Sequence, residues 1–106
     1  MIQTTSTLPV EVPPDVLAFA EDQGVAQYLP AVVEMTRWLF PNYPLTVQLE
    51  DDPEIANDWH IVLVVPAKNL QVPRALELTW DWHRGLFANC PAPLACVFRL
   101  GLELSP

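Results

Sequence analysis

The sequence predicts a two-layer α+β domain in which two helices, two strands, a third helix and a third strand follow one another along the chain. Residues 59–65 form an apolar run interrupted by one polar side chain, which is typical of a strand buried on both faces. Residues 45–50 alternate strictly between apolar and polar side chains, as a strand with one solvated face does. Residues 94–104 place leucine, cysteine and phenylalanine at every second position, which is typical of a strand with two different faces. Three other segments carry apolar side chains at helical spacing and begin at or just after a proline. These patterns give the order ααββαβ.

The three predicted helices are delimited by prolines and glycine. The first covers residues 15–22, because a pair of prolines precedes it and a glycine follows it. The second covers residues 30–40 and is stopped by the next proline. The third begins at Pro73 and ends at Leu86 or Ala88, before a Cys-Pro-Ala-Pro sequence that breaks it.

The third helix carries its apolar side chains over a wide arc. Trp80 and Trp82 are about 200° apart around a helix, so both cannot face one core. One of them must therefore lie at the margin of the core or contact a partner. The arc comprises Leu76, Leu78, Thr79, Trp80, Trp82, Leu86 and Phe87.

The connections predict a three-stranded mixed sheet with residues 59–65 at its centre. The polar loop 51–58 returns the chain, which makes the first two strands antiparallel. The last strand follows a helix, so it should run parallel to residues 59–65, and a right-handed crossover places it beside them. We expect Pro66 to end the central strand. The alternative is a ferredoxin-like βαββαβ fold whose first strand is residues 7–12, although Pro9 would cost that central strand a hydrogen bond.

The length of 106 residues suits one domain with one core. We expect residues 1–13 to form an extended arm and residues 14–104 to form a single α+β domain. Cys90 and Cys96 are expected to be reduced thiols, since nothing here resembles an exported disulfide scaffold.

The charge of the chain argues against several classes of partner. Thirteen acidic residues against five basic ones give a formal net charge of −8, which repels phosphate backbones and anionic lipid surfaces. No apolar run approaches the ~20 residues of a membrane span, and the first residues do not resemble a secretory signal. The sequence therefore predicts a soluble cytoplasmic protein that binds neither nucleic acid nor membrane.

The tripeptide Asp-Trp-His occurs twice, at residues 58–60 and 81–83. A histidine beside a carboxylate can act as an acid–base pair, so His60, His83 and Asp81 are the candidate catalytic residues. However, one copy should enter a strand and the other lie within a helix, so their side chains point in unrelated directions. We expect packing rather than a shared site.

No metal or cofactor site is expected. The two histidines and two cysteines are separated by 23, 7 and 6 residues, unlike the close ligand pairs of structural zinc sites. Cys96 is expected to be a small buried apolar residue on the strand face of Phe98. Five acids between Glu50 and Asp58 lack the glycine and the alternating oxygen ligands of an EF-hand, so they form a solvated loop.

The chain has few charged residues to cover its surface, since 51% of its residues are hydrophobic and only 17% are charged. We therefore expect a non-enzymatic protein-interaction or regulatory module that acts as a homodimer or binds another protein. The alternative is a small ligand-binding or enzymatic domain that uses His60, His83 or both. The interface candidates are Trp80, Trp82, Val97 and Arg99.

Overall fold

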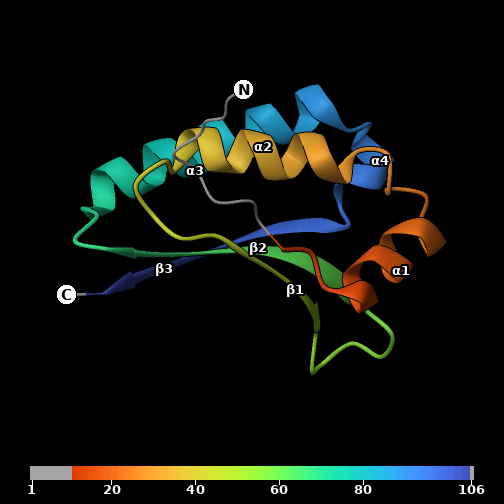
Figure 1. Cartoon of the computed structure of the whole chain (residues 1–106). Helices are drawn as coiled ribbons and strands as arrows, with labels where there is room; N and C mark the ends of the chain where they lie inside the picture. Colours follow the sequence, from red (N-terminus) through yellow and green to blue (C-terminus); the bar gives the residue numbers. More distant parts are fainter. Residues whose placement is uncertain (1–10, 106) are drawn as a thin grey trace.

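The computed structural model describes residues 11–105 and has the predicted α+β architecture, with one short helix added before the last strand (Figure 1). The expected arm of residues 1–13 lies mostly outside the described residues, as do residues 7–10 of the strand that a ferredoxin-like fold requires. The elements are helices α1 (Pro14–Asp22) and α2 (Leu29–Leu39), strands β1 (Thr46–Asp51) and β2 (Trp59–Lys68), helices α3 (Val72–Asn89) and α4 (Ala92–Ala95), and strand β3 (Phe98–Ser105).

The sheet has the order β1-β2-β3, so the apolar strand is central as predicted. Strand β1 pairs antiparallel with β2 from Thr46 opposite Val64 to Asp51 opposite Trp59. Strand β3 pairs parallel with β2, with Phe98 opposite Ile61. Both pairing directions confirm the prediction drawn from the connections.

Helices α2 and α3 lie side by side over one face of the sheet, and no described helix covers the opposite face, which we call the open face (Figure 1). The core lies between the helices and the sheet, where Ile61, Leu63 and Val65 of β2 are fully buried. The alternate residues Val62 and Val64 face the open side and are nevertheless buried. Residues 60–65 of β2 are therefore buried on both faces, which explains why this run is apolar.

Strand β2 continues through Pro66, so the prediction that this proline ends the strand was wrong. The Ile61 N–H donates to the Val97 carbonyl at 2.8 Å, so odd-numbered residues of β2 direct their N–H groups toward β3. The nitrogen of Pro66 thus faces the β1 side, where the ladder has already ended at the Thr46–Val64 pair. A proline is tolerated there because no hydrogen bond is lost.

The last strand begins at Phe98, four residues later than the predicted start at residue 94. The sequence Pro91-Ala92-Pro93 instead starts helix α4, since proline fits a first helical turn, and the Ala95 N–H donates to the Pro91 carbonyl at 2.9 Å. Cys96 therefore follows a helix and is exposed, which corrects the expectation of a buried Cys96 on the strand face of Phe98. Cys90 is the buried thiol.

Within residues 11–105, no helix has the length and apolar character that crossing a membrane requires.

Candidate functional site

Helix α3 presents a second apolar stripe, distinct from the face that it buries. Val72, Leu76, Trp80 and Phe87 are all between 56% and 68% exposed. Their spacings of four, four and seven residues place them on one side of a helix, and His83 lies in the same line. We call Val72, Leu76, Trp80, His83 and Phe87 the outer stripe. An exposed row of large apolar side chains is a candidate interaction surface.

The buried face of α3 is directed at the sheet and at α2. Ala75, Leu78, Trp82 and Leu86 are buried there. Trp82 is 1% exposed, and its indole nitrogen donates a hydrogen bond to the Thr36 hydroxyl at 2.8 Å. Of the two tryptophans that the sequence set about 200° apart, Trp82 therefore lies in the core and Trp80 lies at the surface. Trp82 is not available to a partner.

The outer stripe and the free edge of β3 lie on the same side of the molecule. Gly85 of α3 contacts α2 closely, since a Cβ there would be 2.8 Å from the Met35 sulfur. About a helical wheel, Gly85 and Trp80 point in roughly opposite directions, so the stripe faces away from α2. Helix α3 is the crossover from β2 to β3, and it covers that pair of strands. The side of α3 away from α2 is therefore the side of the β3 edge.

The other two interface candidates lie at the start of β3, Val97 directly before the strand and Arg99 within it. Val97 is half-buried, and its carbonyl is held by the Ile61 N–H of β2. Arg99 is exposed and lies on the open face, where it is paired in register with Val62. Of the four interface candidates, Trp80 and Arg99 are thus the most accessible.

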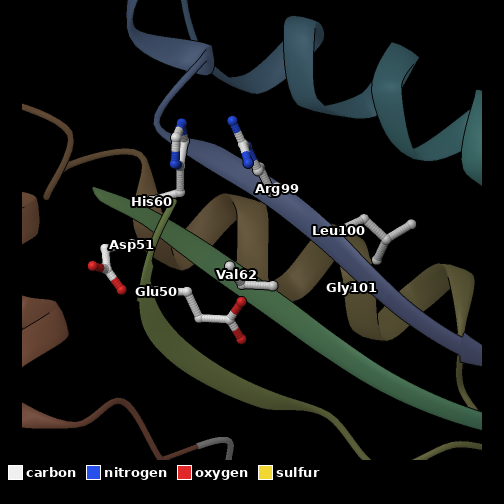
Figure 2. Close-up of a pocket in the computed structure, with 7 residues that line it drawn as sticks. All are labelled: Glu50, Asp51, His60, Val62, Arg99, Leu100 and Gly101. Carbon is white, nitrogen blue, oxygen red and sulfur yellow. The ribbon is translucent and has the colours of Figure 1, made fainter. Parts of the chain in front are cut away.

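A shallow hollow of about 200 Å³ lies on the open face of the sheet (Figure 2). Figure 2 shows the His60 ring and the Arg99 side chain next to each other at one side, and the carboxylates of Glu50 and Asp51 on the β1 side. His60 is about nine-tenths buried. The lining residues are Glu50, Asp51, His60, Val62, Arg99, Leu100 and Gly101.

Asp58 joins the two basic groups of this hollow. One of its carboxylate oxygens lies 3.6 Å from His60 Nε2, and the other lies 3.9 Å from an Arg99 terminal nitrogen. A histidine beside a carboxylate can transfer a proton, but no serine, threonine, cysteine or lysine among residues 11–105 lines the hollow. The arrangement can hold a polar group, and the described residues offer no side-chain nucleophile of those types there.

The second candidate histidine lies elsewhere. His83 is exposed on α3, and its Nδ1 donates to the Thr79 carbonyl at 2.8 Å. Asp81 forms an ion pair with Arg84 on the same helix. His60 is on the open face of the sheet, whereas α3 packs on the covered face, so the two Asp-Trp-His copies do not share a site.

Among the described residues, no three histidine, cysteine or acidic side chains come together as a metal site would need. The acidic loop is organised internally instead, since the Asp52 carboxylate accepts the Glu54 N–H at 2.8 Å.

Comparisons of this chain with protein-family models, with curated proteins and with solved structures gave no match.

Proposed function

We propose that this protein is a non-enzymatic interaction module that acts as a homodimer, with the outer stripe of α3 and the neighbouring β3 edge as its interface. The observation that carries the proposal is the outer stripe, because its apolar side chains lie in one row on the side where the sheet also ends. Aromatic and aliphatic side chains grouped in this way are typical of the central part of interfaces.

The charge distribution supports a second copy as the occupant. The chain has a formal net charge of −8, so two copies repel each other over most of their surface. None of the five positions of the outer stripe carries an acidic side chain. The stripe is therefore a surface on which two copies can approach with little repulsion.

The open edge of β3 supports the same conclusion. Strand β3 is eight residues long, contains no proline and lies at the end of the sheet. An edge of this length exposes backbone donors and acceptors that pair readily with another strand. A homodimer that used this edge would close it.

Sedimentation equilibrium at micromolar concentration tests the proposal. We expect a species of twice the 11.9 kDa chain mass for the natural protein. Trp80→Glu should give the single-chain mass, because it places a charge at the centre of the stripe. The matched control is Trp38→Glu, since Trp38 is 80% exposed on α2 and lies outside the stripe. A natural protein that sediments only as single chains, or equal effects of the two substitutions, would contradict the proposal.

A further inference from the structure

The free edge of β3 offers a defined set of backbone hydrogen-bonding groups. Because the Val97 carbonyl accepts from β2, the odd-numbered residues of β3 direct their backbone groups toward β2. Phe98, Leu100, Leu102 and Leu104 therefore direct theirs outward, where no described residue pairs with them. An incoming strand must use these even-numbered residues for its ladder.

The proposed homodimer brings two such edges together. A two-fold axis pairs identical strands antiparallel, and it lets an even-numbered residue of one copy bond only to an even-numbered residue of the other. The axis can then pass through any single residue of β3. The hydrogen-bonding pattern alone leaves the register open.

The two charged residues of β3 select one register. Arg99 and Glu103 are the strand's charged side chains, and they lie on the same face, two residues on either side of Gly101. An axis at Gly101 sets Arg99 of each copy opposite Glu103 of the other. An axis at Arg99 or at Glu103 would set like charges opposite each other, and an axis at Leu100 or Leu102 would not pair them at all.

Gly101 suits the position on the axis. It would face its own counterpart at a site without direct hydrogen bonds, where the two Cα atoms approach to about 4.5 Å. Val62 of β2 already occupies the space above it, since a Cβ on Gly101 would lie 2.9 Å from Val62 Cγ1. The absent side chain leaves the centre of the junction clear, and the opposite charges lie on either side of it.

The covered face of the sheet is consistent with the same register. Leu100 and Leu102 are half-buried on this face, and the axis at Gly101 sets each opposite the other. Leu104, which is 43% exposed, would lie opposite Phe98 of the second copy. The outer stripe of α3 lies on the same side of the molecule, so the two α3 helices would cover this joined apolar surface.

We infer that two copies of this chain join their β3 strands antiparallel about a two-fold axis at Gly101, forming one continuous six-stranded sheet in which Arg99 and Glu103 of the two copies pair. This inference rests on the proposed homodimer and adds the strand, the direction and the register of its junction.

Charge exchange at the two positions tests the register. Arg99→Glu and Glu103→Arg each set like charges opposite one another twice in a homodimer, so each should weaken association about tenfold at low salt. The double variant Arg99→Glu/Glu103→Arg restores opposite charges and should dimerise like the natural protein. An equimolar mixture of the two single variants should form a heterodimer with natural affinity, because each charge then meets its complement. The measurement is the dimer dissociation constant from sedimentation equilibrium.

The rescue separates this inference from other effects of the substitutions. Arg99→Glu also places an acid near Asp58, which lies 3.9 Å from Arg99, but mixing two variants cannot repair a contact within one chain. If the natural protein is a dimer that Trp80→Glu dissociates, and the mixture shows no rescue, the register is wrong while the proposed function stands. If the single variants dimerise as tightly as the natural protein, Arg99 and Glu103 of the two copies do not face each other, and the register about Gly101 is wrong. If the natural protein is a single chain, both proposals fail.

Discussion

The Trp82 indole nitrogen donates a hydrogen bond to the Thr36 hydroxyl at 2.8 Å, which joins α3 to α2 inside the core. The same hydroxyl donates to the Val32 carbonyl at 2.7 Å, so its proton and one acceptor site are both used. Thr36 and Trp82 are almost fully buried, and water cannot replace either partner without a change in packing. This contact fixes which of the two tryptophans on α3 enters the core.

We predict that Thr36→Val lowers the free energy of unfolding by about 1–3 kcal/mol, because it leaves the buried indole N–H without an acceptor. Trp82→Phe should also lower the free energy of unfolding. The loss in the double variant should be smaller than the sum of the two single losses, because both substitutions break the same hydrogen bond. Thr79→Val is the control, since the Thr79 hydroxyl donates to the Ala75 carbonyl of its own helix. Urea denaturation followed by circular dichroism measures all four. Additive effects of Thr36→Val and Trp82→Phe would show that the hydrogen bond contributes nothing.

The fold could be predicted from the sequence where the signal is local. The apolar run of β2 and the alternation in β1 report directly on burial at each position, and the helix between β2 and β3 imposes a parallel pairing. The end of β2 could not be predicted, because whether Pro66 costs a hydrogen bond depends on where the antiparallel strand β1 begins. The start of β3 was missed because Leu94 and Cys96 continue the spacing of the large apolar residues Phe98 to Leu104, although the prolines before them favour a helix.

The outer stripe left a signal in the sequence that the prediction did not separate from the core. Residues 76, 80 and 87 repeat at helical spacing, as do residues 75, 78, 82 and 86. Both rows are apolar, and only the packing of α3 against the sheet and α2 decides which one is buried. The hollow left no such signal, because Asp58 and Arg99 are far apart in the sequence and meet only through the parallel register of β2 and β3.

We predict that Leu63→Ala is among the most destabilising single substitutions, with a loss of about 2–5 kcal/mol. Leu63 is fully buried on the helix-covered face of the central strand, so its truncation removes apolar contacts and leaves a cavity. Leu17→Ala, at a side chain that is 47% exposed on α1, is the matched control and should change stability by less than ~1 kcal/mol. Comparable losses in denaturant melts would contradict the central position of Leu63.

The two cysteines should differ in reactivity. Cys96 is exposed and Cys90 is buried, so a thiol reagent should modify one thiol rapidly in the native protein and both after unfolding. Cys96→Ala should abolish the rapid phase, whereas Cys90→Ala should leave it intact. Rapid modification of both thiols in the native state would show that the region around Cys90 opens readily.

Burial raises the pKa of the Cys90 thiol, which predicts a dependence of stability on alkaline pH. The unfolded chain then loses this proton at a lower pH than the folded chain, so the native state holds more protons and its stability falls as the pH rises. The stability that the protonated Cys90 thiol contributes is fully present below the ordinary thiol pKa of about 8.5, and it is lost as the pH rises above that value. The fall in the free energy of unfolding between pH 8 and 10 should be smaller in Cys90→Ala than in Cys96→Ala; equal slopes would refute this.

The last prediction concerns metal content. Replacing His60 and His83 together by glutamine should leave the metal content of the purified protein unchanged, because the two rings lie on different layers of the fold and neither belongs to a group of three ligands among residues 11–105. The single replacements His60→Gln and His83→Gln show which ring is responsible for any change in metal content. The two rings have different surroundings, since His60 lies beside Asp58 whereas the His83 ring contacts its own helix. The measurement is elemental analysis of protein prepared without added metal or a polyhistidine tag, with circular dichroism to verify the fold. Stoichiometric zinc, nickel or iron in the natural protein that disappears with His60→Gln alone would assign a metal function to the hollow on the open face, and it would displace the interaction module as the primary activity.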